Sequence, residues 1–154
     1  MQLGDILRAE GVKVLGATSS KKRLFQELAE MAFGTFNLDP AKVVEALIER
    51  ENLGPTGVGH GVALPHARLQ QLDKMRGLFV RLDKPLDFDA VDRQPVDLIF
   101  ALFAPASAGV DHLKALALVS RTMRNPGICA KLRANHDPMK LYTILTDSPA
   151  IQAA

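Results

Sequence analysis

The sequence predicts a single α/β domain in which helices cover both faces of a β-sheet. The strongest strand signal is Val96–Ala104, which is apolar at nearly every position around Asp97. A run of this kind is typical of a central strand that is buried on both faces. Segments with the apolar period of an amphipathic helix alternate with such short runs along the chain. The 154 residues show no internal repeat and no linker, and they suffice for one domain with a substantial core.

The first part of the chain is predicted to form a helical turn, a strand and a long helix. Apolar residues within 3–7 indicate about one helical turn, and the alternation over 12–15 indicates a short strand. A helix is expected over about 20–36, because apolar residues recur on one face at helical spacing. Its first turn is cationic at 21–23, which the helix dipole disfavours, so these cations form either a solvated face or a docking patch for an acidic partner. The inward positions of this helix are Leu24, Phe25, Leu28, Ala29, Ala32 and Phe36.

A second helix is predicted to begin after Asp39 and to end before Gly54. Asp39 is a typical N-cap residue, and Pro40 suits the first helical position. Gly54 and Pro55 together stop the helix. Arg50 lies in the last turn, where the dipole favours a cation, and this is its simplest structural role. The core-facing positions are Val43, Val44, Leu47 and Ile48.

The second half of the chain is predicted to add two strands and three helices. The strands are 77–82 and 96–104, separated by a loop over 85–95 with paired turn signals. A loop of small residues at 106–110 precedes a helix that begins near Asp111. The apolar stripe of that helix is expected to be Leu113, Leu116, Ala117, Ser120 and Met123.

Two shorter helices are predicted to complete the domain. Pro126 begins the first, and Asp137 followed by Pro138 repeats the cap-and-proline pattern at the start of the second. The tail at 148–154 has little to bury and is expected to be loose.

The stretch Gly54–Arg68 is where the sequence concentrates its turn residues. It holds four glycines and two prolines, so it is not a helix interior. Val62–Leu64 is long enough for a brief strand, and Pro65 restricts Leu64 to extended geometry. His66 is therefore expected at the end of a strand, beside backbone that can approach and cradle an anion. A lone histidine in a loop is otherwise most often a solvated surface residue.

Several kinds of site are excluded by spacing. A dinucleotide motif would need glycine at Val62, and no P-loop is present. His60, His66, Asp111 and His112 lack the spacing of a zinc site, and no nucleophile-elbow motif occurs. We therefore expect neither a metal nor a cofactor. A phosphoryl group carried on an imidazole needs no nucleotide site.

Composition limits the partners and the compartment. The net charge is +2 and aromatic residues make up 5%, without tryptophan, which argues against a nucleic-acid partner. The single cysteine, Cys129, excludes an internal disulfide, suits a reducing compartment and is expected to be buried. Asp5, Arg8 and Glu10 exclude a signal-peptide core, and no run approaches the length of a membrane span. We expect a cytoplasmic protein without membrane insertion.

The run Gly57–Ala67, G-V-G-H-G-V-A-L-P-H-A, resembles the active-site signature of the IIA proteins of the bacterial phosphotransferase system, fructose/mannitol type. Segments 18–23, 50–54 and 88–98 resemble the nitrogen-related IIA branch, the PtsN-like proteins, in the same order. The resemblance covers roughly residues 3 to 147. It implies a single IIA domain over 1–154, with a mixed rather than a purely parallel sheet.

The same resemblance assigns the site residues. The Leu-Pro-His motif gives His66 the phosphoryl-accepting role, and by motif position the neighbouring histidine and arginine of the family match His112 and Arg50. Ala67 stands where glycine is common in relatives, a change that should be tolerated. Because strand ends gather at one edge of an α/β sheet, we expect His66 to meet the loop that precedes His112. His60 is interpreted as incidental. His136 is expected to be plain surface.

Two functions follow from the resemblance. In the first, His66 accepts a phosphoryl group from an HPr-like phosphoprotein, and the chain regulates partner proteins according to its phosphorylation state. In the alternative, a sugar-specific IIA component passes the group to a IIB domain for fructose or mannitol uptake. The absence of a linked IIB or permease segment favours the first. A non-catalytic binding module would leave His66 idle, which the presence of Arg50 and His112 disfavours.

Overall fold

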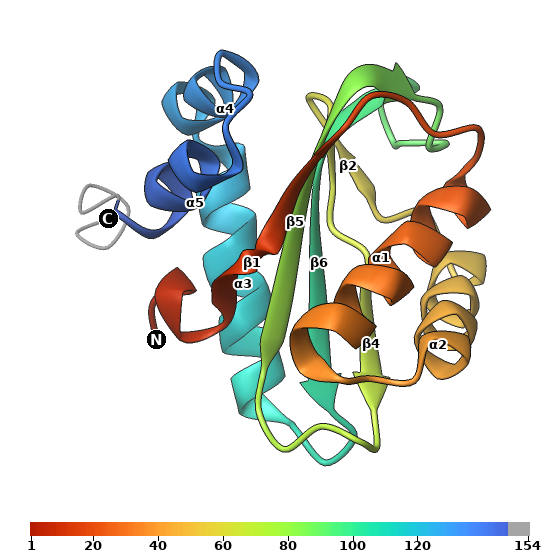
Figure 1. Cartoon of the computed structure of the whole chain (residues 1–154). Helices are drawn as coiled ribbons and strands as arrows, with labels where there is room; N and C mark the ends of the chain where they lie inside the picture. Colours follow the sequence, from red (N-terminus) through yellow and green to blue (C-terminus); the bar gives the residue numbers. More distant parts are fainter. Residues whose placement is uncertain (148–154) are drawn as a thin grey trace.

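The computed structural model describes residues 1–147, and the tail predicted to be loose, 148–154, lies outside these residues. A mixed sheet stands between two helical layers, with α1 and α2 on one face and α3, α4 and α5 on the other (Figure 1). The predicted α/β domain with a mixed sheet is therefore confirmed. No helix within 1–147 combines the length and apolarity that crossing a membrane requires.

The strands are β1 (Leu7–Leu15), β2 (Gly57–Gly59), β3 (Val62–Ala63), β4 (His66–Leu69), β5 (Arg76–Leu86) and β6 (Val96–Pro105). The helices are the 3-10 turn η1 (Leu3–Asp5), α1 (Lys21–Phe36), α2 (Pro40–Asn52), α3 (Val110–Arg124), α4 (Pro126–Arg133) and α5 (Pro138–Thr146).

Strand β6 is the centre of the sheet. The strand order is β1-β5-β6-β3-β2, and β4 also pairs with β6. Strand β6 is antiparallel to β5 but parallel to β3 and β4, while β1 is parallel to β5. Alternate side chains of β6 enter separate core clusters, Phe100 beneath α3–α5 and Phe103 beneath α1 and α2. This confirms the prediction of a central strand covered on both faces.

Strands β3 and β4 follow one another along the same side of β6. The registers Val62↔Leu98 and His66↔Leu102 continue past Pro65, whose carbonyl accepts from the backbone N–H of Leu102 over 2.9 Å. Pro65 has no N–H to give, so the ladder is interrupted there and resumes at once. His66 was expected to end a strand, and instead it begins β4. His66 is therefore carried on the sheet itself.

Two strands are longer than predicted. Strand β1 begins at Leu7, which was assigned to a helical turn, because Leu7 pairs with Gly77 of β5 across an irregular register. Strand β5 extends into the predicted loop because Leu86 pairs with Val96. Strand β2, which pairs with β3, was not predicted at all. These differences arise from pairing between distant segments, which local pattern does not report.

The helix starts are as predicted. The Asp39 carboxylate accepts from the N–H of Ala41, and the Asp137 carboxylate accepts from that of Met139. Pro40 takes a first-turn position in α2. Cys129 is buried, as expected.

The predicted apolar stripe of α3 is wrong in part, although Met123 is buried and Leu116 packs against the core as expected. Leu113 is 67% exposed and Ala117 is exposed, whereas His112 faces inward. The pattern misled because two of the inward positions carry polar side chains. One is His112, and the other is Thr122, whose hydroxyl is satisfied by the Leu118 carbonyl at 2.9 Å. The buried residues of α3 are His112, Ala115, Leu118, Val119, Thr122 and Met123.

Candidate functional site

A cleft of about 680 Å³ brings together the three side chains that the sequence singled out. Arg50 comes from the last turn of α2, His66 from the start of β4 and His112 from the first turn of α3. The strand-edge argument correctly placed His66 beside the segment that carries His112. The remaining lining is apolar at Ala46, Leu53 and Ala67 and polar or charged at Glu49, Asn52 and Arg68.

The ring of His66 is held at both nitrogens. Its Nδ1 lies 2.9 Å from the carbonyl oxygen of Leu64, which can only accept, so Nδ1 carries the proton. Its Nε2 therefore keeps a lone pair, to which Nε–H of Arg50 donates over 3.1 Å. Burial lowers the pKa of His66, and the charge of Arg50 lowers it further, while the Leu64 bond and Glu51 act the other way. The ring is therefore neutral at physiological pH, and its free lone pair is on Nε2.

Arg50 serves the helix end and the site at once. Its Nη1 donates to the Gly54 carbonyl over 3.0 Å, in the turn that closes α2. Its Nε–H points at His66. The helix-end role expected from its position is present, and the planar fork leaves the guanidinium within reach of any group on Nε2.

His112 is buried beside His66 without a hydrogen-bond partner. The two rings meet edge to face, with centroids 5.8 Å apart. His112 is 7% exposed, and among the described residues neither ring nitrogen has a partner. Burial lowers the pKa of His112, and the nearby charges of Arg68 and His66 lower it further. Leaving a buried polar group unpaired costs about 1–3 kcal/mol, so a neutral imidazole held this way is a candidate donor to a bound group.

Three charged residues at the site were missed by sequence reasoning. Glu49, an exposed residue of α2, lines the cleft. Arg68 lines the cleft two residues after His66 and donates to the carbonyl of Ala108. The i, i+2 periodicity of a strand would have indicated it, had β4 been predicted. Glu51 lies beneath the cleft and forms an ion pair with Lys21, the first cation of α1, over 3.3 Å. Lys21 is therefore partnered within the domain and does not form part of a purely solvated face.

The other two histidines lie outside the cleft. His60 is exposed in the β2–β3 turn, where it adopts φ 58°. Its backbone is bound on both sides, by the Asp92 carboxylate at 3.0 Å and by Nη2 of Arg133 at 2.7 Å. His136 is exposed, and its Nδ1 lies 3.4 Å from the Asp83 carboxylate. Within residues 1–147, no group of three or more His, Cys, Asp or Glu is arranged to hold a metal ion.

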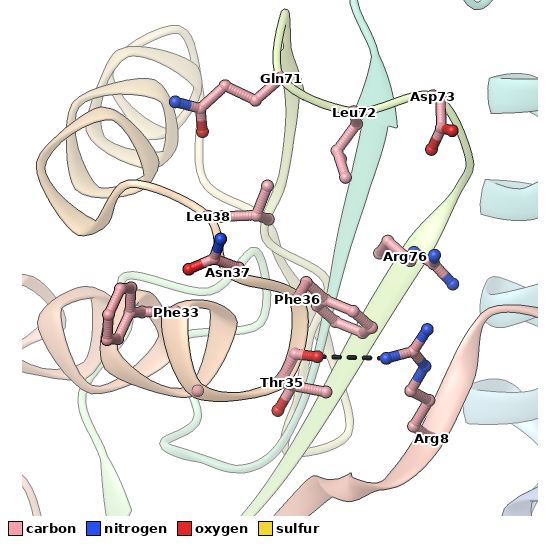
Figure 2. Close-up of a pocket in the computed structure, with 11 residues that line it drawn as sticks. Arg8, Phe33, Thr35, Phe36, Asn37, Leu38, Gln71, Leu72, Asp73 and Arg76 are labelled. Atoms are coloured by element: carbon pink, nitrogen blue, oxygen red, sulfur yellow. Dashed lines mark hydrogen bonds between the residues drawn. The ribbon is translucent and has the colours of Figure 1, made fainter.

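A second cavity, of about 720 Å³, lies at the C-terminal end of α1 and shares no lining residue with the His66 cleft (Figure 2). Arg8 and Arg76 both lie over the ring of Phe36, and Nη1 of Arg8 donates to the Thr35 carbonyl over 3.2 Å. Cations at this end of a helix complement its dipole. A structural role in ending α1 accounts for them.

The lowered pKa values predict how stability depends on pH. His66 and His112 titrate below their ordinary value in the folded chain and near pH 6.5 when unfolded, so below 6.5 the unfolded chain binds more protons. The free energy of unfolding should therefore hold above pH 6.5 and fall as the pH drops from there through the lowered values. Urea unfolding at about pH 7.5 and about pH 5.5 measures it. His112→Leu should lose part of this pH dependence, whereas Leu113→Ala, which changes an exposed residue of the same helical turn and removes no titratable group, should keep all of it. Equal dependence in the two variants would contradict the assignment.

Comparison with known proteins agrees with the resemblance of the motifs. A family model described as "Phosphoenolpyruvate-dependent sugar phosphotransferase system, EIIA 2" matches residues 5–148. A nitrogen regulatory protein of Bradyrhizobium diazoefficiens is 46% identical over 153 residues, which cover 99% of this chain and 100% of the relative. Nitrogen regulatory protein IIA-Ntr from Neisseria meningitidis has a crystal structure that matches with a TM-score of 0.86 and 37% identity, over 94% of this chain and 99% of that one.

The fold is also that of IIA mannitol from Escherichia coli, at a TM-score of 0.76 and 17% identity over 90% of this chain and 98% of that one. The prediction of a fructose/mannitol-type IIA protein that is most similar to the nitrogen-regulatory branch is confirmed. The chain belongs to the EIIA 2 family of the phosphoenolpyruvate-dependent sugar phosphotransferase system.

Proposed function

We propose that the chain is a histidine phosphoryl carrier that takes a phosphoryl group from an HPr-like phosphoprotein onto Nε2 of His66 and regulates partner proteins through its phosphorylation state. The observation that carries the proposal is the neutral Nε2 lone pair, fixed by the bond from Nδ1–H to Leu64 and facing Arg50. The similarity to proteins named nitrogen regulatory proteins supports the regulatory branch. The single Cys129 favours the cytoplasm as its location.

The transfer balances without a metal or a cofactor in the chain. The lone pair of Nε2 attacks phosphorus, the P–N bond of the donor phosphohistidine breaks, and the donor imidazole leaves with that electron pair. The His66 ring keeps Nδ1–H and becomes cationic, a state that the Leu64 carbonyl stabilises. Arg50 then donates to the phosphoryl oxygens, and His112 gains acceptors for its ring N–H. Such a transfer needs mainly positioning and charge stabilisation from the protein.

The surface around the cleft suits a partner that distinguishes the two states. Leu53, on the rim, is 85% exposed, and Leu113 projects from the first turn of α3. A phosphoryl group would add about 1.5 to 2 negative charges to this apolar face. A partner that buries the face would lose affinity, because a desolvated and unpaired charge costs several kcal/mol. The backbone need not move; only the affinity need differ between states.

The sugar-transport alternative rests on the family description, which names a sugar phosphotransferase system. In that case the phosphoryl group on His66 would move on to a IIB domain for fructose or mannitol. Both functions use His66 as the nucleophile. They differ only in which protein accepts the phosphoryl group from His66 or binds the surface around the cleft.

The test measures transfer first and partners second. The chain is incubated with a phosphorylated HPr-like carrier, and intact-protein mass spectrometry should show one acid-labile phosphoryl adduct. Phosphorylated and unphosphorylated chains are then used in parallel pull-downs from the source cell extract, with His66→Ala and the imperfect mimic His66→Asp beside them. Different sets of retained proteins are expected. Identical sets, together with transfer to a purified IIB domain, would instead establish the sugar-transport function.

A further inference from the structure

We infer that Glu51 is a positioning residue that fixes the ring orientation and the Nδ1–H tautomer of His66, acting through the backbone of Thr56 and Leu64. Glu51 does not touch the reacting atoms. This inference rests on the proposed role of His66 as a phosphoryl acceptor. The ring geometry that it concerns can be measured without any transfer.

The first link joins Glu51 to Thr56. Both carboxylate oxygens of Glu51 accept from the backbone N–H of Thr56, at 3.0 and 2.9 Å, and both lie 3.0 Å from its hydroxyl. Thr56 is 4% exposed, and the side chain of Glu51 is 7% exposed. A charged acceptor with several bonds in a buried setting holds its donor strongly. The position of the Thr56 backbone is thereby set.

The second link passes from Thr56 to the imidazole. The carbonyl of Thr56 accepts from the N–H of Leu64 over 2.9 Å, and the carbonyl of Leu64 accepts from Nδ1–H of His66 over 2.9 Å. Pro65 interrupts the strand ladder between Leu64 and His66, so the bond from Thr56 anchors the Leu64 peptide at that break. A change at Glu51 would turn the carbonyl that selects the tautomer.

The buried carboxylate is compensated by a cation from the other helix. Nζ of Lys21 lies 3.3 Å from Oε1 of Glu51 and 4.6 Å from the ring centroid of Phe88. Removing Lys21 would leave the buried carboxylate of Glu51 without a compensating charge, so Glu51 requires Lys21 as its partner. The ion pair with Glu51 thus explains why α1 begins with Lys21, although the helix dipole disfavours a cation at that end. The charged groups near His66 are then Glu51 and the cleft residues Arg50, Glu49 and Arg68, while His112 in the same cleft is neutral.

The experiment reads the tautomer directly, by NMR of ¹⁵N-labelled histidine in the full chain. Wild-type His66 should be almost entirely Nδ1–H. Glu51→Gln keeps one acceptor and loses the charge, Glu51→Ala loses both, and Thr56→Val loses only the hydroxyl bond. The Nε2–H form should therefore increase from Thr56→Val through Glu51→Gln to Glu51→Ala. Displacing a reacting group by about 1 Å can cost about 100-fold, so phosphoryl transfer should fall by about 10- to 100-fold in the same order.

Two matched controls separate positioning from general effects. Glu45→Gln removes the same charge from the same helix, at an exposed position that does not line the cleft and whose side chain makes no hydrogen bond or ion pair within residues 1–147. Thr56→Ser restores the hydroxyl that Thr56→Val removes. Both should keep the wild-type tautomer and the wild-type rate.

The possible outcomes keep the two proposals apart. A wild-type tautomer in folded Glu51→Gln overturns the positioning role, and if Glu51→Ala does not fold, the glutamine and valine variants decide. A shifted tautomer in these variants, combined with no phosphoryl transfer to the wild-type chain, leaves the positioning role standing and overturns the proposed function. A shifted tautomer in Glu45→Gln as well would show that the effect comes from charge alone and would also overturn the positioning role.

Discussion

Phosphorylation by an HPr-like donor should be lost completely when His66 is replaced by alanine. The variant removes the one imidazole that combines a fixed Nδ1–H with a lone pair facing an arginine. Among the described residues that line the cleft, the other imidazole is that of His112, whose ring nitrogens are buried. Intact-protein mass spectra recorded after incubation with the phosphorylated donor measure the result.

The controls for this prediction are the two histidines outside the cleft. His60→Ala and His136→Ala should accept the phosphoryl group at the wild-type rate, because neither ring lines the cleft. Circular dichroism should show that all three variants are folded, since His66 is only partly buried and its removal leaves the core intact. A phosphoryl adduct that persists in His66→Ala would move the site elsewhere.

The second large effect is expected when Arg50 or His112 is replaced. Arg50→Ala and His112→Leu should each slow phosphoryl transfer by about a hundredfold, the usual cost of losing one donor to developing oxyanion charge. Arg50→Ala removes the hydrogen bond to Nε2 of His66, and His112→Leu removes the ring that packs edge to face against the His66 imidazole. Single-turnover transfer followed by rapid acid-free quenching and mass spectrometry gives the rates.

Stability distinguishes a functional His112 from a structural one. Because neither ring nitrogen of His112 has a partner among the described residues, leucine of similar volume should leave the free energy of unfolding equal or higher. Lys42→Ala, which removes an exposed cation from the same helix as Arg50, is the matched control for charge and should transfer normally. Wild-type rates in both Arg50→Ala and His112→Leu would show that the two side chains serve only the fold.

Local sequence signals predicted those parts of the fold that local chemistry determines. The N-cap at Asp39, with Pro40 after it, marked the start of α2, and the apolar run at 96–104 marked the central strand. The short strand β4 was missed because its four residues, interrupted from β3 by Pro65, depend on pairing with β6 for their conformation. Such pairing contributes nothing to a pattern read along the chain.

The same distinction applies to the site, where local signals indicate some residues and the roles of others depend on tertiary contacts. His66 was singled out because glycines and prolines gather around it, and the resemblance of its motif added Arg50 and His112 by position. Glu51 sits beside Arg50 in that segment, yet its role depends on Thr56 being brought back against the helix end. The inward face of His112 likewise depends on how α3 docks, which is why the apolar stripe of that helix was misplaced.

The placement of His66 on β4, hydrogen-bonded into the most buried strand of the sheet, has a consequence for encounter kinetics. A nucleophile on a mobile loop must be ordered each time a partner arrives, and that ordering slows association. Here the acceptor ring, its arginine and the apolar rim are already in place before contact. Association with a donor should then need little backbone change and should proceed at about 10⁵–10⁷ M⁻¹s⁻¹, the range set by orientation alone. The dwell time of each complex is then governed by how fast the partners separate.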